Sequence, residues 1–522
     1  MNVMKKWNEV NEKIHWWDLF IGLVGGFVFI FCLLYFKKSI FSGYHFVDDH
    51  EMVYFKYLHD QGESYFNILF SVLKTDLTWR FRPFYYVERV ALSLLFGGDL
   101  LQSNIWTAIK GVISFLFLYL SARNLKCDIL FSGLFSCVVV LGTQFEIWYR
   151  CANQENTGLL LMAVVIFLVS YVRKNNKYNS KSIKVIISFL IVLMVLTKES
   201  FLLALPFIIA ISFLDEMYSF EGNDKNLFER IKIIFKRNSA FYIFTILLFA
   251  ICIIILVKFV GVDNVSYAGF HKEDKIDAYL NMLWLSVKFF LKGYIIVFVS
   301  LMIINIISLI IERKNKERDK YKTYKIFMYF VVLFLAMVVQ VIAHAKSMLG
   351  VRYLIPWTVF YAGVAVVITF YLTKNQIVLR CISFTILSIF VVTQFYISYE
   401  QTLEYKNKGI SCVKTLEHVK SVSNSEDIII GCFDEEELNV STERWLETQG
   451  FKSVFSYSEK ENKVINYIKL SNDSINDVDL KDAKVIVCYS WCTDDIIELA
   501  GMEKEKVDVF NTDYYSVIQN NN

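Results

Sequence analysis

The stretch LFIGLVGGFVFIFCLLYF, residues 19–36, decides the fold class of this chain. It holds 18 residues without a charge, close to the roughly 20 apolar residues with which a helix crosses a bilayer. No small-residue cleavage site follows it, so we expect the helix to be retained and not removed as a signal peptide. The stretch therefore predicts a membrane-spanning helix.

The same apolar character extends over most of the chain. Of its 522 residues, 55% are hydrophobic, and the mean hydropathy is +0.43, a level that soluble domains rarely reach. The turn Lys198-Glu199-Ser200 joins two short apolar runs and also fits a shallow hairpin. We expect an α-helical polytopic membrane protein with about eleven crossings, near residues 17–36, 104–121, 129–145, 157–171, 183–197, 201–214, 240–257, 283–311, 326–343, 353–372 and 381–399.

The charges predict the orientation of these helices. The formal net charge is only +3, which gives no indication of a nucleic-acid partner. Basic residues gather in alternate loops, which the positive-inside rule assigns to the cytoplasm; these loops are 5–6, 123–126, 173–184 and 313–325. We therefore expect a multi-pass protein of the cell membrane with a cytoplasmic N-terminus.

The remaining loops then face outward, and the longest is the first loop, residues 37–103. An odd number of crossings also places the polar tail outside. We therefore divide the chain into a membrane domain, residues 1–400, and a soluble extracytoplasmic domain, residues 401–522. A small α/β fold is expected for the second, with strands near 427–431, 452–457 and 484–489 and a helix near 441–449.

Four cysteines belong to this tail: Cys412, Cys432, Cys488 and Cys492. In an extracytoplasmic domain they could pair as disulfides. Buried free thiols are the alternative, because a thiol also serves as a small apolar group.

A cluster of charge, Asp48-Asp49-His50-Glu51, follows the first helix at the start of the first loop. Paired carboxylates suit general-base chemistry, because one accepts a proton while the other holds a partner. On a helix, Asp48 and Glu51 would share a face. The alternative is a solvated loop start. A divalent cation is a further option, although the spacing of its ligand set is generic; that set is His45, Asp48, Asp49 and His50.

Basic residues on the same predicted side are candidates for binding an anion. Arg80 and Arg82 lie between aromatic residues beside Pro83, and guanidinium groups contact phosphate bidentately. The alternative is an interfacial segment that anchors the loop. Lys110, about 9 Å below the outer start of the second helix, is a further candidate of this kind.

Two more elements carry charge where it is costly. The Lys198-Glu199 pair lies between short apolar spans, where a charge is costly unless water or an opposite charge contacts it. The pair is therefore a candidate site, and the alternative is a simple hairpin tip without a function. Arg352 and Tyr353 follow His344 and Lys346. A positive cluster on the outer side runs against the usual topology bias, so we expect an anionic ligand there, with snorkelling to lipid phosphate as the alternative.

The acidic pair, an Arg-Pro element (82–83), a Lys-Glu hairpin (198–199) and an Arg-Tyr-Leu-x-Pro element (352–356) occur in this order on one predicted side. The arrangement resembles the GT-C membrane glycosyltransferases, which include the protein O-mannosyltransferases and the bacterial enzymes that add aminoarabinose to lipid A. The likeness covers residues 17–400 and does not extend to the C-terminal domain.

This resemblance implies a hexose or pentose carried on a polyprenyl phosphate and transferred at the outer membrane face. Asp48 or Asp49 would be the catalytic base, and the choice between them stays open. Arg82, Lys198 and Arg352 would bind the donor phosphate, and Lys110 is kept as a fourth candidate. The residues expected to support them are Glu51, His50, Glu199 and Tyr353.

Other functions fit less well. A transporter or flippase of a lipid-linked saccharide would place charge at mid-membrane depth, whereas most charge here lies at the outer helix ends. A membrane-anchored protein that binds the cell envelope through its C-terminal domain is the other alternative. The sequence has no Walker loop, Ser-His-Asp order or HExxH motif, so ATP-driven pumping and metalloproteolysis lack support. The acceptor would be a cell-envelope glycan, lipid or protein.

Overall fold

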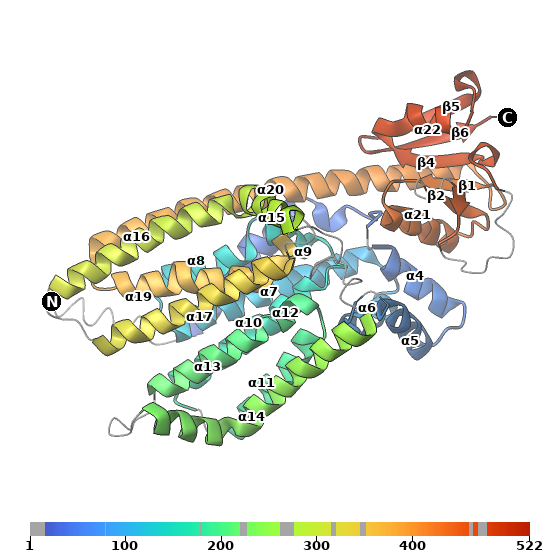
Figure 1. Cartoon of the computed structure of the whole chain (residues 1–522). Helices are drawn as coiled ribbons and strands as arrows, with labels where there is room; N and C mark the ends of the chain where they lie inside the picture. The colour runs from blue at the N-terminus through green and yellow to red at the C-terminus, as the bar shows by residue number, and fades with distance from the viewer. Residues whose placement is uncertain are drawn as a thin grey trace.

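The structure, a computed structural model, consists of a long helical bundle with a small sheet domain at one end (Figure 1). It describes residues 16–47, 49–78, 80–177, 180–219, 227–260, 276–314, 320–344, 351–458, 463–467 and 478–521. We call the end of the bundle that carries the C-terminal domain the domain end, and the opposite end the far end. The protein is a multi-pass membrane protein with an appended α/β domain, as the composition predicts.

The first apolar stretch forms one continuous span, and the first loop folds into short helices. The span consists of α2 (Trp16–Gly26), the π-helix η1 (Phe27–Cys32) and α3 (Leu33–Phe36). The 3-10 helix η2 (Ser39–Phe41) then leads to α4 (Asp49–Asp60), α5 (Tyr65–Asp76) and α6 (Pro83–Leu95). Local sequence sets these boundaries: Ser64 accepts a hydrogen bond from the Asn67 amide as the N-cap of α5, and proline begins α6, where a missing N–H costs nothing.

The rest of the bundle alternates long spans with short helices. Asp99 caps α7 through the Leu101 amide at 2.8 Å, and Asp128 caps α8 through the Phe131 amide at 2.8 Å. The helices in chain order are α7 (Leu100–Asn124), α8 (Ile129–Val140), η3 (Thr143–Phe145), α9 (Glu146–Tyr149), α10 (Glu155–Lys174), α11 (Lys181–Val195), α12 (Glu199–Leu202), α13 (Leu205–Ser219), α14 (Leu227–Ile255), η4 (Leu256–Val260), α15 (Ile276–Ser286), η5 (Val287–Leu291), α16 (Lys292–Lys314), α17 (Lys320–His344), η7 (Val351–Leu354), α18 (Ile355–Ala362), η8 (Gly363–Ile368), α19 (Thr369–Thr373) and α20 (Ile377–Val422).

Within the described residues, nine helices are long and apolar enough to cross a membrane, or ten if one bent pair counts as a span. The sequence predicts about eleven. The difference lies in two places: α11 has only 15 residues, and the third predicted crossing bends by 71° between α8 and the η3–α9 segment. Gly142 makes this bend with a φ of +105°, a conformation open mainly to glycine.

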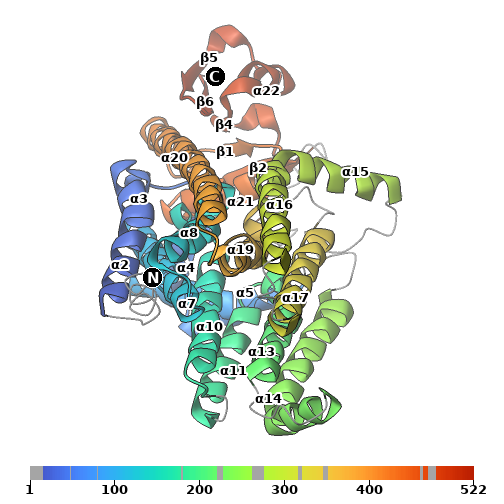
Figure 2. The ribbon, with the colours of Figure 1, turned by 90° about the vertical axis from the view of Figure 1, so that its left-hand side faces the viewer.

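The core of the bundle is the helix formed by α18, η8 and α19, whose side chains are almost all buried. Figure 2 looks along the bundle and shows α19 surrounded by α8, α16, α17 and α20. The first helix is tied to the bundle by charge at the far end. There the Asp18 carboxylate accepts hydrogen bonds from Arg123 at 2.7 Å and from the Tyr119 hydroxyl at 3.1 Å, which pairs an otherwise costly buried carboxylate.

The C-terminal domain is a six-stranded sheet of order β3-β2-β1-β4-β6-β5. β1 pairs in parallel with β2 and β4, and the other pairs are antiparallel. Strands β1, β2 and β4 and helix α21 confirm the four elements that the sequence predicts, and β3, β5, β6 and α22 were not predicted. The bounds are β1 (Ile429–Cys432), α21 (Glu436–Thr448), β2 (Val454–Ser458), β3 (Lys463–Ile465), η9 (Leu480–Asp482), β4 (Val485–Tyr489), η10 (Ser490–Cys492), α22 (Thr493–Leu499), η11 (Lys504–Lys506), β5 (Val507–Asn511) and β6 (Tyr515–Asn520).

All ten cysteines of the chain are described, and all are free thiols. In the C-terminal domain Cys412, Cys432, Cys488 and Cys492 are buried. Of the two alternatives for these four residues, the structure has the buried thiols.

One helix joins the two domains. α20 has 46 residues, which at 1.5 Å per residue gives about 69 Å, more than twice the ~30 Å hydrocarbon core. The helix runs through residue 400, the predicted domain boundary, without a break. The domain also docks on the first loop: the Tyr44 hydroxyl donates to the Ser441 carbonyl at 2.9 Å, and the Phe46 ring packs against Tyr515 with ring centres 4.8 Å apart.

Candidate functional site

A cavity of about 360 Å³ lies at the domain end, and its lining is mainly polar. Its walls come from three parts of the chain that are far apart in sequence. The first loop supplies residues of α4, α5 and α6, the bundle supplies residues before α10, α12 and α18, and the C-terminal domain supplies residues of α21. We call this space the polar cavity. It brings together Glu51, Arg82, Lys198, Arg352 and Tyr353 of the predicted site residues.

α4 gives one face to the polar cavity. Glu51, Tyr54, Phe55 and Leu58 line it, and their spacing of three or four residues places them on one side of the helix. The Glu51 carboxylate forms an ion pair with Arg89 at 2.7 Å. This pair fixes the carboxylate at the cavity wall.

Arg82 is held in a fixed orientation. Its Nε and Nη2 atoms donate to the Asp76 carboxylate at 3.1 and 2.5 Å, and Nη2 also donates to the Tyr86 hydroxyl at 3.2 Å. Arg82 is buried and precedes Pro83, the first residue of α6. A guanidinium fixed in this way is preorganised for an anion.

Lys198 lines the cavity from the turn between α11 and α12. Its ammonium group forms an ion pair with Glu155 and lies 4.1 Å from the centre of the Tyr353 ring. The side chain is buried. Burial lowers the pKa of Lys198 to about 8, and the charge of Glu155 opposes this shift. The protonated state is therefore lost just above neutral pH.

Arg352 belongs to the same group of cations. Its Nε atom lies 3.3 Å from the Glu146 carboxylate, and its Nη2 donates to the Tyr353 hydroxyl at 3.0 Å. Its Nη1 donates to Asn153 at 3.4 Å. Tyr353 thus contacts Lys198 with its ring and Arg352 with its hydroxyl, so the two cations lie side by side at one wall of the polar cavity.

The C-terminal domain closes the other side. Glu437 and Arg444 line the cavity from α21, two turns apart on one helix face. The Arg444 guanidinium lies 5.1 Å from the centre of the Tyr54 ring. Its Nε atom is buried and has no hydrogen-bond partner in the described part of the chain.

Gln154 is a second lining residue with an unpaired polar atom. Gln154 lines the cavity with only 8% of its surface exposed, and its Oε1 accepts no hydrogen bond from the described residues. Buried polar atoms are normally paired, so this oxygen is ready to accept from a hydroxyl. No motif in the sequence points to Gln154, Asp76 or Glu437, and the predicted helix 441–449 contains Arg444 without indicating a role for it.

Asp49 and His50, the other described members of the predicted acidic cluster, do not line the polar cavity. Asp49, the first residue of α4, is buried; its carboxylate accepts from the His45 backbone amide at 3.2 Å and lies 3.7 Å from the Cys151 thiol. Asp48 lies outside the described residues, and His50 is buried on α4.

Lys110 and Glu199 have structural partners. The Lys110 ammonium donates to Asn156 at 2.6 Å, to Thr157 at 2.9 Å and to Glu88 at 3.1 Å. The Glu199 carboxylate accepts from the Phe81 backbone amide at 3.2 Å. Lys110 therefore ties α7 to α6 and α10, and Glu199 ties α12 to the first loop.

The predicted cation ligands do not form a metal site among the residues that can be described. No group of three or more histidine, cysteine, aspartate or glutamate side chains there has the arrangement to hold a metal ion. His45 Nδ1 lies 3.1 Å from Asp49, and its Nε2 lies 3.0 Å from the Tyr405 carbonyl. Both nitrogens of His45 are thus already engaged.

Comparison with known proteins finds similarity in structure and none in sequence. No family model matches the chain, and no curated protein matches it in sequence. The structure is similar to the crystal structure of ArnT from Cupriavidus metallidurans bound to undecaprenyl phosphate, with 12% sequence identity and a TM-score of 0.44. The similarity covers 96% of this chain and 97% of ArnT.

Proposed function

We propose that this protein is a membrane glycosyltransferase. It would take a hexosyl or pentosyl group from a polyprenyl-phosphate carrier and transfer it to an acceptor hydroxyl on the extracytoplasmic face. The observation that carries the proposal is the meeting of Arg82, Lys198 and Arg352 in one polar cavity at the end of an apolar bundle. These three residues are distant in sequence, and the resemblance to GT-C glycosyltransferases implies the same ligand, the donor phosphate, for all three.

The charges of the cavity fit a phosphate that leaves with growing negative charge. Each of the three cations is held by its own carboxylate: Arg82 by Asp76, Lys198 by Glu155 and Arg352 by Glu146. Such fixed groups stabilise developing charge without rearranging during the reaction. The polyprenyl chain of the donor would lie in the membrane beside the bundle, with its phosphate at the domain end.

The transfer step needs a base near the acceptor. The acceptor oxygen would form a bond to the anomeric carbon, the carrier phosphate would leave with the electron pair of the broken C–O bond, and a carboxylate would take the hydroxyl proton. We assign the base to the acidic cluster after the first helix, with Asp48 and Asp49 as candidates. Of the described acids in that cluster, Glu51 reaches the cavity, so it joins them as a third candidate.

The two unused polar atoms fit the acceptor side. Gln154 Oε1 can accept from a sugar or acceptor hydroxyl, and Arg444 offers a donor from the opposite wall. The acceptor would be a cell-envelope glycan, lipid or protein that enters between the first loop and the C-terminal domain. A transporter would instead need its polar site near mid-membrane depth, so the cavity's position at the bundle end favours an enzyme.

A transfer assay with purified protein tests the proposal. The protein, reconstituted in liposomes, would receive polyprenyl-phosphate donors with radiolabelled sugar, with and without EDTA. We expect label to move to the acceptor, with a loss of about 100-fold for Arg352→Gln. Lys56→Gln is the control, because Lys56 pairs with Asp60 on α4 away from the cavity. Transbilayer movement of the donor without any transfer would instead establish a flippase.

A further inference from the structure

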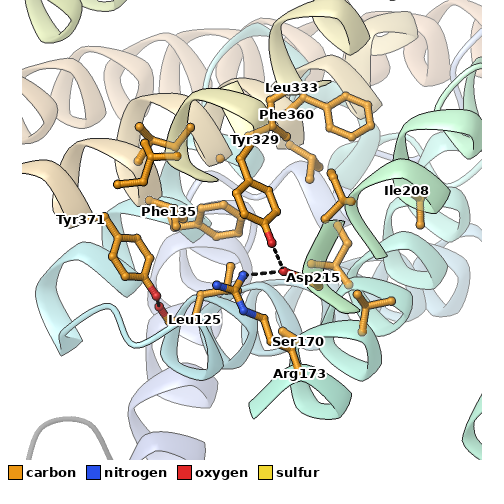
Figure 3. Close-up of a pocket in the computed structure, with 18 of the residues that line it drawn as sticks. Leu125, Phe135, Ser170, Arg173, Ile208, Asp215, Tyr329, Leu333, Phe360 and Tyr371 are labelled. Atoms are coloured by element: carbon orange, nitrogen blue, oxygen red, sulfur yellow. Dashed lines mark hydrogen bonds and ion pairs between the residues drawn. The ribbon is translucent and has the colours of Figure 1, made fainter. Parts of the chain in front are cut away.

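A second cavity lies toward the far end of the bundle, away from the proposed active site. It has a volume of about 290 Å³ and lies between α10, α13, α17, α18 and η8 (Figure 3). Most of its wall is aliphatic or aromatic; Phe135, Ile208, Leu333 and Phe360 are examples. We call it the apolar cavity. Its size and lining are those of a site for a hydrocarbon chain.

Polar groups gather at one place on this wall. The Asp215 carboxylate, 3% exposed, lies 2.9 Å from Arg173 Nη1 and accepts a hydrogen bond from the Tyr329 hydroxyl. The Arg173 guanidinium also lies 5.6 Å from the centre of the Tyr329 ring. Figure 3 shows these three side chains meeting beside the apolar residues. The charges of Arg173 and Asp215 cancel, so this pair adds no net charge to the site.

Lys325 adds an unbalanced positive charge. It lines the same cavity from α17, and its ammonium group lies 5.2 Å from the centre of the Tyr218 ring. No carboxylate forms an ion pair with Lys325 among the residues that the structure describes. An ammonium group without a carboxylate partner at the edge of an apolar cavity would be stabilised by a bound anion.

The position of these cations along their helices places them at headgroup depth. Arg173 is in the last turn of α10, and Lys325 is in the second turn of α17. Both lie at the bundle end where the sequence predicts the basic cytoplasmic loops. Basic pockets between membrane helices on that side are typical binding sites for anionic lipid headgroups.

We propose that the apolar cavity binds an anionic phospholipid of the cytoplasmic leaflet. One acyl chain would occupy the apolar wall, and Lys325, with Arg173 beside it, would bind the headgroup phosphate. This site is separate from the polar cavity, and the proposal does not depend on the glycosyltransferase activity. The carrier polyprenyl phosphate has a similar head and tail, so it is the competitor that the experiment must separate.

Native mass spectrometry of the full-length protein in mild detergent tests this proposal. Phosphatidylglycerol and phosphatidylcholine with the same acyl chains would be added in equal amounts. We expect wild-type protein to retain phosphatidylglycerol about fivefold better, and Lys325→Gln to lose this preference while Lys325→Arg keeps it. Lys181→Gln is the control, because it removes a charge from the exposed start of α11 on the same side.

A cavity-filling variant tests the chain site independently of charge. Ile211 lines the cavity, and Ile211→Trp should reduce retention of both lipids with little change in melting temperature. The proposal is overturned if wild-type protein retains both lipids equally, or if Lys325→Gln keeps the wild-type preference. It is also overturned if an equal amount of polyprenyl phosphate displaces phosphatidylglycerol, because the occupant would then be the carrier.

Discussion

The two cavities treat charge in opposite ways. In the polar cavity, Arg82, Lys198 and Arg352 are each held by a carboxylate of the protein. In the apolar cavity one such pair is present, and Lys325 contacts the Tyr218 ring but forms no ion pair with a carboxylate in the described part of the chain. Paired cations keep their geometry when no ligand is bound, which suits a site that must stabilise changing charge. A cation without a carboxylate partner at an apolar wall suits a ligand that carries an anionic group and binds without reacting.

The same contrast separates catalysis from lipid binding in experiment. Changes in the polar cavity should act on sugar transfer, and changes in the apolar cavity should act on lipid retention. The predictions below follow from that division, beginning with the largest expected effect.

Removing the charge of Lys198 should have as large an effect as Arg352→Gln. Lys198→Gln should lower kcat/KM for transfer by about 100-fold, because a cation that stabilises the leaving phosphate is lost. Initial rates over a range of donor concentrations measure this. Lys198→Gln also leaves the Glu155 carboxylate buried and unpaired, so it should lower the melting temperature. The double variant Lys198→Gln/Glu155→Gln removes that carboxylate; it should restore the melting temperature and leave the rate low. Recovery of the rate would mean that Lys198 acts through folding alone.

The pH dependence should follow the same ammonium group. Its pKa is about 8, below the usual value, so the protonated form that binds phosphate prevails at pH 7 and is lost as the pH rises through 8. We expect kcat/KM to fall about tenfold between pH 7 and pH 9. Lys198→Arg should shift this decline to higher pH, because a guanidinium stays protonated. An identical profile for the two proteins would remove Lys198 from the donor site.

Changes in the C-terminal wall should have a smaller effect. Arg444→Gln should reduce kcat/KM about fivefold, the size expected for one hydrogen bond to a ligand, and mainly through KM for the acceptor. Glu436→Gln is the matched control, because Glu436 is exposed on the same helix and does not line the cavity. An unchanged KM in Arg444→Gln would leave the domain without a role in substrate binding.

The smallest effect on transfer is expected in the apolar cavity. Lys325→Gln should change kcat/KM by less than about twofold, because distant sites contribute independently. Lipid retention should change in the same preparation. A large loss of transfer would show that the two cavities are coupled and that lipid binding and sugar transfer are not independent.

Much of this arrangement can be predicted from the sequence. Membrane spans follow from apolar length alone, and short β-rich runs located β1, β2 and β4. Arg82, Lys198 and Arg352 were placed together because helix order and sidedness put all three at one end. Apolar length and β-rich runs are local signals, and helix order adds the side of the membrane on which each loop lies.

Tertiary contacts decide the rest. Lys110 resembles a site cation in the sequence, yet it is saturated by Glu88, Asn156 and Thr157, which no local pattern connects to it. Arg444 enters the cavity only because the C-terminal domain docks on Tyr44 and Phe46. The broken third crossing depends on one glycine with a positive φ, and hydropathy does not report such a break.

Because α20 is one unbroken helix, a change of its tilt in the membrane also moves the C-terminal domain. A rigid rod about 69 Å long moves its tip by about 6 Å when it tilts by about 5°. The domain carries Arg444 to the mouth of the polar cavity, so a tilt of α20 presses on its contact with Tyr54 and on the docking at Tyr44. Bilayer thickness influences helix tilt. A change in thickness would therefore change the width of the opening through which an acceptor would enter the polar cavity.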